Sequence, residues 1–549
     1  MTDKDNYYYN EDITQGVAIT ISTAIAKEAK DSFLQSEWAR NIPAYLLLRD
    51  DDEVTIYFNQ LDESQKEWLH NRLLEGGFQS AAGTVAGLRQ AERDPANSRI
   101  GNLKMLAQAL AKYLVSDFLD GWIYTVGGRD EQMPWLVNNI YYQEGGNAPP
   151  NVVMHLVANS PVMSREDMSR PSTRMIYFFA DDLRALKVAD ILATKGFVKE
   201  TTALRQAYLG SIERFTRYMP QMNHQFIATE SGLEIDLEQG KRYAELIPFD
   251  QPVKVINDEG MVQRKFFAQM DTPIWGSIGK VYSDIPIHPK IFCFNLETHT
   301  NMWIHVNNLE EYQYNPSLRN KLILPPEHRD LVDILTQDMD ILMEDIVAGK
   351  SGGTTILCKG APGLGKTLTA EVYSEVVGRP LYRVHSGQLG VDSAAVEASL
   401  DKILKRAQRW GAVMLIDEAD VYIRQRANDI DHNAVVAAFL RTLEYFHGLL
   451  FLTTNRVDDV DDAIASRCIA TIIYEPPRTE DARRIWKVLA DQFSFTLNDA
   501  LITELADHFD GISGRDIKEL LKLTVKWCRQ KNVEPSVDVF RSCAQFRGL

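Results

Sequence analysis

The carboxyl-terminal half of the chain alternates short apolar runs with longer segments of helical periodicity. Apolar runs typical of buried strands occupy residues 354–359, 381–385, 412–417, 449–454 and 469–474. Segments with the spacing of amphipathic helices lie between them, at residues 366–377, 394–410 and 434–445. Strands that alternate with helices predict a parallel sheet covered by helices, so we expect an α/β core in this half.

Both flanks of this core are predicted to be helical. Apolar residues recur at helical spacing from Leu331 to Ile346 and end at Gly349, after a linker marked by Pro325-Pro326. Beyond Pro476-Pro477, helical segments occupy residues 479–493, 498–508, 514–529 and 536–546. We interpret the first flank as a helix that leads into the core and the second as a small helical lid.

The amino-terminal half has weaker patterns. Its first part mixes a predicted helix at 103–118 with strand-like runs at 122–126, 152–157 and 175–179. The next part is strand-rich, with apolar runs at 226–229, 253–256, 291–294 and 302–306, and favours a β-sandwich or barrel. The predicted division is therefore a mixed α/β region at 1–220, a β-rich docking or recognition domain at 221–318, the α/β core at 319–478 and the lid at 479–549.

Composition narrows the class of protein. A chain of 549 residues is long enough for several domains, because a single core stops growing at about 250–300 residues. The hydrophobic share of 45% and the charged share of 25% are ordinary for a soluble globular protein. The formal net charge of -17 argues against indiscriminate binding to nucleic acid or anionic membranes, although a local basic patch stays open.

Several further features favour a cytoplasmic protein without a metal cluster. The 5 cysteines include no C-x-x-C pair, so we expect isolated thiols in place of a disulfide framework or zinc site. His155 and His224 are each alone on their segments and are expected to be packed or solvated. Residues 1–10 are acidic and tyrosine-rich, unlike a secretory signal, and no stretch approaches the length of an apolar membrane span.

A glycine-rich string directly follows the first predicted strand of the core: Gly360, Ala361, Pro362, Gly363, Leu364, Gly365, Lys366, Thr367 and Leu368. Its glycines allow successive backbone N–H groups to point at one anion, and the helix that follows adds the positive end of its dipole. The ammonium of Lys366 suits the outer phosphates of a nucleotide, and the Thr367 hydroxyl suits Mg²⁺. The alternative, a flexible glycine loop without function, does not account for the strand before it and the helix after it.

An acidic pair, Asp417-Glu418, ends the third predicted strand of the core. A metal-bound nucleotide needs one carboxylate near Mg²⁺, and hydrolysis needs another to polarise water. The carboxyl ends of parallel strands meet at the edge of the sheet where ligands bind, and the glycine-rich string also lies there. We therefore expect ATP and Mg²⁺ as cofactors, with Thr367 and Asp417 as metal ligands.

The carboxyl-terminal residues from about 325 to 549 resemble the AAA+ ATPase family, a resemblance that Leu452-Thr453-Thr454-Asn455 carries together with the motifs above. Further motifs resemble a branch of fungal and bacterial AAA+ proteins in which a β-rich region precedes the ATPase. These are Gly390, the segment 410–422, Leu440-Arg441-Thr442-Leu443-Glu444-Tyr445-Phe446 and Ala465-Ser466-Arg467. The resemblance implies a P-loop NTPase fold with a helical lid.

The resemblance also implies catalytic roles. Glu418 would orient and deprotonate the attacking water, and Asn455 would position that water as sensor 1. Arg467 matches the arginine finger, which reaches into the site of the next subunit. Arg515 matches sensor 2 at the start of a lid helix, where it would contact the γ-phosphate. Since a finger that acts in trans requires assembly, the resemblance implies a homo-oligomer, usually a ring of six.

Some of these assignments have ordinary alternatives. Asp417-Glu418-Ala419-Asp420 also spells a helicase tetrapeptide, but no other helicase motif accompanies it. Arg467 is open to interpretation as a surface arginine. Arg515 is equally able to pair with Asp516 or Glu519 of the lid.

The leading functional hypothesis is an oligomeric ATPase that remodels or disassembles a protein partner bound through residues 1–318. The loop 386–392 lacks the aromatic residue that threading members of the family present, although Leu389 and Val391 are candidates to grip a substrate. A second hypothesis is therefore an ATP-controlled assembly scaffold or sensor in which hydrolysis only resets the state. Translocation of nucleic acid is a third, and the acidity of the chain argues against it.

Overall fold

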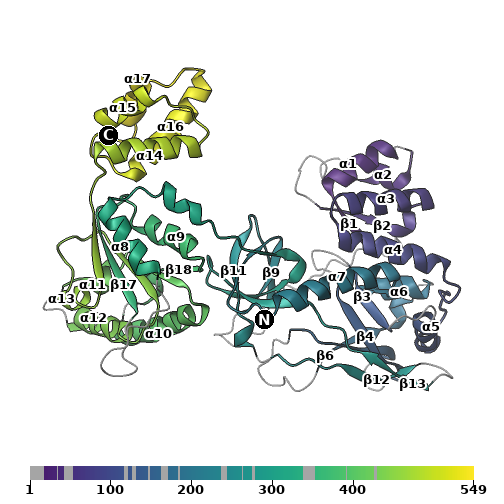
Figure 1. Cartoon of the computed structure of the whole chain (residues 1–549). Coiled ribbons are helices and arrows are strands. Elements are labelled where there is room, and N and C mark those ends of the chain that lie inside the picture. The colour runs from purple at the N-terminus through teal and green to yellow at the C-terminus, as the bar shows by residue number, and fades with distance from the viewer. Residues whose placement is uncertain are drawn as a thin grey trace, which may run out of the picture.

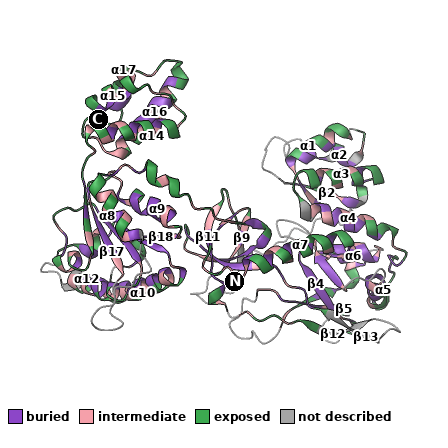
Figure 2. Ribbon diagram, in the orientation of Figure 1, coloured by how far each residue is buried: buried purple, intermediate pink, exposed green. Residues whose placement is uncertain are grey.

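The computed structural model describes residues 18–33, 35–42, 53–115, 121–126, 132–145, 149–161, 171–183, 186–235, 244–262, 264–274, 279–337, 353–390, 392–425 and 430–549. In chain order these residues form an amino-terminal mixed region, a β-rich sheet, an α/β core and a helical lid (Figure 1). Buried residues concentrate on the strands, and the outer faces of the lid helices are exposed (Figure 2).

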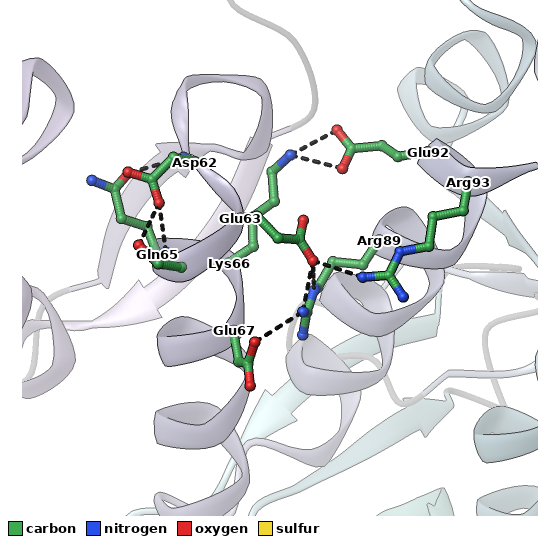
Figure 3. Close-up of polar contacts among 9 residues, drawn as sticks. Asp62, Glu63, Gln65, Lys66, Glu67, Arg89, Glu92 and Arg93 are labelled. Carbon is green, nitrogen blue, oxygen red and sulfur yellow. Dashed lines mark hydrogen bonds and ion pairs between the residues drawn. The ribbon is translucent and has the colours of Figure 1, made fainter.

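The amino-terminal region begins with a small helical unit. It contains β1 (Ala18–Ser22), α1 (Thr23–Ser32), α2 (Glu37–Asn41), β2 (Glu53–Tyr57), α3 (Glu63–Glu75) and α4 (Gln79–Arg93). Asp62 caps α3 in a capping box with Gln65, and ionic contacts tie α3 to α4 (Figure 3). The Lys66 ammonium lies 2.7 Å from Glu92, and the Arg89 guanidinium 2.7 Å from Glu63.

An antiparallel sheet of 5 strands follows, in the order β6-β5-β4-β3-β7. Its strands are β3 (Trp122–Thr125), β4 (Pro134–Gln143), β5 (Asn151–Ala158), β6 (Ser172–Phe178) and β7 (Phe197–Lys199). Helices α5 (Leu103–Val115) and α6 (Val188–Thr194) share a buried cluster with it, in which Leu106, Leu110, Met154 and Leu156 are fully buried. The predicted helix and strands of this region are present, and the last residues expected for the helix lie outside the described ranges.

The β-rich part is a single sheet of 7 strands, ordered β10-β9-β15-β14-β11-β8-β16. Its strands are β8 (Gln225–Ala228), β9 (Ser231–Ile235), β10 (Ala244–Pro248), β11 (Val253–Asn257), β14 (Lys290–Asn295), β15 (Asn301–His305) and β16 (Leu309–Glu311). The described strands leave β10 and β16 as edges, so the expected sandwich or closed barrel is wrong.

The reason is that helices and the α/β core cover this sheet in place of a second sheet. On one face, Val255, Ile291 and Met302 share a buried cluster with Phe215 of α7 (Thr202–Tyr218). On the other face, residues of β11 and β14 belong to the main cluster of the α/β core. Alternation along a strand shows which residues are buried and does not show what covers them.

The hairpin between β11 and β14 leaves the β-rich sheet. Its strands, β12 (Gln269–Ile274) and β13 (Gly279–Asp284), pair with each other. The residues around it bind the amino-terminal sheet: the Asn159 N–H donates to Pro286 O at 2.8 Å, and the Trp122 indole N–H donates to Asp284 O at 2.9 Å. A segment from the β-rich range of the sequence thus packs on the preceding region.

The α/β core confirms the expected P-loop fold. Its parallel strands have the order β18-β19-β20-β17-β21. They are β17 (Thr354–Gly360), β18 (Leu381–His385), β19 (Val413–Asp417), β20 (Leu449–Thr454) and β21 (Ala470–Tyr474). The helices include α8 (Pro326–Gln337), α9 (Lys366–Val377), α10 (Ser393–Trp410) and α12 (Ile430–Leu443). The expected continuation of α8 to Ile346 and Gly349 lies outside the described residues.

The lid contains α14 (Thr479–Gln492), α15 (Asp499–His508), α16 (Gly514–Lys531) and α17 (Val537–Gln545), as the helical periodicity predicts. Its own core centres on Trp486 and Phe540, which are fully buried and meet edge to face at 5.4 Å. Because the lid buries its own apolar cluster, it is a separate unit that is able to keep its shape beside the core.

Candidate nucleotide site

The glycine-rich loop joins β17 to α9. Gly360, Gly363 and Gly365 have φ of 149°, 84° and 100°, which L side chains rarely adopt. A Cβ on Gly363 would lie 2.7 Å from Ser513 Oγ and 2.8 Å from Arg515 Cβ. Glycine is therefore needed at 363 both for the backbone conformation and for the close approach of the lid.

Lys366 folds back over this loop. Its ammonium donates to Gly360 O at 2.7 Å, Ala361 O at 2.8 Å and Asn455 Oδ1 at 3.0 Å. Burial lowers the pKa of Lys366, and the nearby Asp417 and Asp420 carboxylates oppose that shift. The ammonium is thus held beside the N–H groups of the loop, where an anion would sit.

Asp417 lies at the carboxyl end of β19 and is nearly fully buried. Its Oδ1 accepts hydrogen bonds from Thr367 at 3.0 Å and Thr453 at 2.6 Å, and its Oδ2 lies 2.6 Å from Arg383. Burial by itself raises the pKa of Asp417, but these hydrogen bonds and the Arg383 charge outweigh burial and bring the pKa below its ordinary value. The carboxylate is therefore ionised at neutral pH.

Glu418 is exposed and adopts a left-handed backbone with φ of 55°. Its N–H donates to Thr453 Oγ at 3.0 Å, which holds the turn after β19. A left-handed glutamate costs about 1–3 kcal/mol, a kind of strain that clusters at active sites. The N–H of Asn455 donates to Asp420 Oδ1 at 3.2 Å, and its side chain accepts from Lys366 as described above.

One cavity of about 990 Å³ brings most of the predicted residues together. Residues 362–368, Asp417, Glu418, Asn455 and Arg515 all line it. Its other walls come from residues 321–328, residues 473–478 and helix α14 of the lid. These walls include apolar side chains, of which Leu322, Leu324, Ile473 and Ile485 are examples. Apolar side chains in the same cavity as a phosphate-binding loop suit a nucleotide, which joins a flat aromatic base to charged phosphates.

Sequence reasoning missed part of this cavity. Pro325-Pro326 was interpreted only as a linker, whereas these residues line the cavity. Sequence reasoning also missed Arg383, which lines the cavity and binds Asp417. A charged residue within a short predicted strand of the core was the only local signal, and it does not show which partner the charge has. Burial raises the pKa of Glu371, which also lies near Arg383, and Arg383 opposes that shift.

The two predicted arginines differ in position. Arg467 lies outside this cavity, with its guanidinium 3.2 Å from Glu444 of the same chain. Arg515 is exposed in the cavity, and its N–H donates to Gly363 O at 3.1 Å. Its suggested lid partners are otherwise engaged: Asp516 lies 3.2 Å from Arg547, and Glu519 lies 2.8 Å from Lys522.

The donors at the loop fit Mg²⁺. A threonine hydroxyl and an ionised carboxylate are hard oxygen ligands, and Mg²⁺ usually takes one or two such groups together with phosphates and water. No cluster of three or more His, Cys, Asp or Glu side chains suited to a metal occurs among the described residues. His155 lies beside Tyr141, His224 is exposed, and the 5 cysteines are free thiols.

The expected contact loop for a substrate has a different arrangement. Leu389 is fully buried in the core cluster, so it does not face outward as a grip for substrate. The Tyr422 hydroxyl lies 2.6 Å from Ser386 O and 2.8 Å from Gly390 O, so its single proton is donated to either carbonyl or shared by both, which pins this loop to the core. Val391 lies outside the described residues. In the part of the chain that the structure describes, every helix is too short or too polar to cross a bilayer.

Comparison with known proteins gives a family for the core. Residues 356–476 match the family model described as ATPase family associated with various cellular activities (AAA). The chain is similar to the ATPase family AAA domain-containing protein FIGL1 of Arabidopsis thaliana, with 28% identity over 231 residues, 40% of this chain and 34% of that protein. It is also similar to the Mitochondrial sorting homolog of Caenorhabditis elegans, with 28% identity over 183 residues, 31% of this chain and 52% of that protein.

A solved structure, the E. coli MS115-1 HORMA:CdnC:Trip13 complex, contains a chain that shares 18% identity and a TM-score of 0.34 with this one. That match covers 42% of this chain and 90% of the other, and the score is too low to carry an argument. The matches to the two curated relatives span between about a third and a half of their length, and none of these matches reaches across the amino-terminal regions as a whole.

Proposed function

We propose that this chain hydrolyses ATP with Mg²⁺, as an oligomer, to remodel or disassemble a protein partner. The match of residues 356–476 to the AAA ATPase family model supports the ATPase part of this proposal. The observation that carries the proposal is the single cavity in which the glycine-rich loop, Asp417, Glu418 and Asn455 converge. A positioned anion site, a metal ligand and a candidate base within one cavity are what phosphoryl transfer to water requires.

The chain's own residues would divide this work. The loop N–H groups and Lys366 bind the phosphates, and Thr367 and Asp417 would hold the metal. When bound, Mg²⁺ neutralises charge on the phosphate oxygens. Glu418, exposed to the cavity, orients and deprotonates the attacking water, and Asn455 fixes that water's position. The hydrogen bond from Lys366 to Asn455 at 3.0 Å keeps both side chains at the same place.

Arg467 is the residue from which we infer an oligomer. This side chain lies outside the cavity of its own chain, so a role in hydrolysis requires that it serve a neighbouring subunit. Its present partner, Glu444, is about half exposed, and an exposed ion pair is worth little. The guanidinium is therefore free to exchange Glu444 for a phosphate at low cost.

The amino-terminal regions are the proposed site of partner recognition. The structure supports a second candidate, a nucleotide-controlled scaffold, through one observation: Leu389 is buried and the loop that carries it is pinned by Tyr422. Among the described residues of this loop, the one apolar side chain is buried and therefore offers little grip for threading. A substrate polypeptide found in a central channel during turnover would contradict the scaffold.

The proposal is tested with Glu418→Gln, which removes the base and keeps the shape of the side chain. We expect nucleotide binding to be retained and hydrolysis to fall roughly 100-fold or more. Glu397→Gln on α10, a carboxylate paired with Arg441 at the surface, is the matched control and should leave hydrolysis unchanged. Full hydrolysis by Glu418→Gln would contradict the role of the base. A pulldown with the same variant under ATP would identify the partner.

A further inference from the structure

Arg383 lies between two carboxylates at the edge of the nucleotide cavity. Its Nη2 lies 2.6 Å from Asp417 Oδ2, and its Nη1 lies 3.5 Å from Glu371 Oε1. The Nε of Arg383 is buried and makes no hydrogen bond to the described residues. The guanidinium is thus held by its two ends, tightly by Asp417 and loosely by Glu371.

The two carboxylates differ in what else they do. Asp417 is the proposed metal ligand, and its Oδ1 is already engaged by Thr367 and Thr453. Glu371 lies on α9, four positions after Thr367, and so faces the same side of the helix one turn further on. Its side chain is 42% exposed, whereas that of Asp417 is 6% exposed.

A divalent ion at Thr367 would share the Asp417 carboxylate with the Arg383 guanidinium. Two cations on one buried carboxylate repel each other strongly, since the medium between them screens poorly. Glu371 offers the guanidinium a second carboxylate, which Nη1 of Arg383 already approaches to 3.5 Å. A rotamer change of a half-exposed arginine is sufficient for that shift.

We propose that Arg383 is a positioning residue that occupies Asp417 when no metal is bound, competes with Mg²⁺ for that carboxylate, and moves to Glu371 when Mg²⁺ binds. This inference rests on the proposed ATPase function and concerns how the same site accepts its metal. In the nucleotide-free chain, the guanidinium pairs with the buried Asp417 carboxylate. Without a cation beside it, burial of that charge would be unfavourable. Binding of metal then requires that this pair open first.

Replacing Arg383 and replacing Glu371 should change the Mg²⁺ requirement for nucleotide binding in opposite directions. In Arg383→Met the competitor is absent, so the Mg²⁺ concentration that half-saturates binding of a non-hydrolysable ATP analogue should fall about tenfold, the scale of one charge interaction near a partly buried site. In Glu371→Gln the guanidinium loses its alternative partner, so that concentration should rise. Lys405→Met, which removes an exposed cation paired with Asp401, is the control and should not shift it.

Binding is measured with a fluorescent non-hydrolysable ATP analogue across a Mg²⁺ series, and metal binding directly by electron paramagnetic resonance with Mn²⁺. Thermal unfolding checks that each variant is folded. A higher Mg²⁺ requirement in Arg383→Met would show that Arg383 only orients Asp417 and would overturn the proposal, as would an unchanged requirement. If the unaltered chain does not bind the analogue at any Mg²⁺ concentration, the proposed ATPase function fails, and that result is distinct from a failure of the switch.

Discussion

At the scale of single residues, the nucleotide cavity joins side chains whose types are restricted by phosphate and metal chemistry to others that only the fold brings together. The glycine-rich loop and Asp417-Glu418 could be predicted because the chemistry of phosphate and metal restricts both residue type and spacing. Arg383 could not, because its partner lies 34 positions away and no local pattern connects a charged strand residue to a distant carboxylate. Leu389 misled the interpretation of its loop, since an apolar side chain in a loop is as able to face inward as outward.

Gly363 provides a prediction at this scale. An alanine there would adopt a left-handed φ of 84° and collide with Ser513 and Arg515 of the lid. The backbone strain alone costs about 1–2 kcal/mol. The collision would in addition push the lid residues Ser513 and Arg515 away from the loop. We expect Gly363→Ala to lower the unfolding temperature and to weaken nucleotide binding, measured by thermal unfolding and by titration with a fluorescent nucleotide.

Gly511→Ala separates the effect of backbone strain from the effect of a collision with the lid. Gly511 has φ of 76°, and a Cβ there would meet nothing within 4 Å. This variant should lose a similar backbone contribution to stability and keep nucleotide binding. Equal loss of binding in both variants would contradict the role of lid contact at Gly363.

At the scale of elements, the strongly periodic core was predicted nearly residue for residue, and the amino-terminal region was not. The predicted ranges 381–385 and 449–454 coincide with β18 and β20, because each is a short run bounded by turn residues. Only β20 is buried along its whole length, whereas β18 is an edge strand with alternating burial. The pairing of α3 with α4 combines a shared apolar cluster with ion pairs such as Lys66 with Glu92, and periodicity reveals neither partner.

The contact between the β-rich sheet and α10 provides a prediction at this scale. Asp258, which follows β11, is buried and accepts from Arg409 at 2.7 Å and from the Trp410 indole N–H at 2.9 Å. Asp258→Ala leaves both donors without this acceptor, which costs about 2–3 kcal/mol once the partial exposure of Arg409 is considered. We expect a lower unfolding temperature by calorimetry.

Protease digestion shows which part of the Asp258→Ala variant is destabilised. In Asp258→Ala, cleavage between the sheet and the core should become faster, because the lost hydrogen bonds join these two parts. Asp401→Ala on the exposed face of α10 is the control, since its carboxylate pairs only with Lys405 among the described residues. A variant at Asp258 that unfolds and digests like the unaltered chain would contradict the importance of this contact.

At the scale of the whole molecule, the parallel core and the lid could be predicted because each buries its own apolar cluster from nearby segments. The position of the β-rich sheet could not, since it depends on surfaces from distant parts of the chain. Phe294 of β14 packs against Trp410 and Tyr382 of the core, with ring centroids 5.0 Å and 5.8 Å apart. An apolar residue on a strand does not show which neighbour will cover it.

Assembly provides the prediction at this scale. If Arg467 completes the site of the next subunit, Arg467→Ala should bind ATP normally and lose hydrolysis. Mixing Arg467→Ala chains with Lys366→Ala chains should restore part of the hydrolysis, because some boundaries then hold an intact loop on one side and an intact arginine on the other. Hydrolysis is measured against the mixing ratio and the total protein concentration.

Glu444→Gln is the companion variant. It removes the partner that holds Arg467 within its own chain, so hydrolysis should be maintained. A dilute monomer that hydrolyses ATP at the full rate without Arg467 would contradict the shared site.

The hairpin β12–β13 and its flanks decide how the chain is best divided for experiments. A fragment that starts after residue 220 keeps this hairpin and loses the sheet on which it rests, including the Trp122 indole that binds Asp284 O. The complementary fragment, residues 1–220, loses Pro286 O, the acceptor of the Asn159 N–H. Truncation at that boundary therefore breaks contacts on both products. Soluble fragments are better sought by separating the helical lid, which buries its own apolar cluster, and by keeping the β-rich sheet together with the α/β core that covers one of its faces.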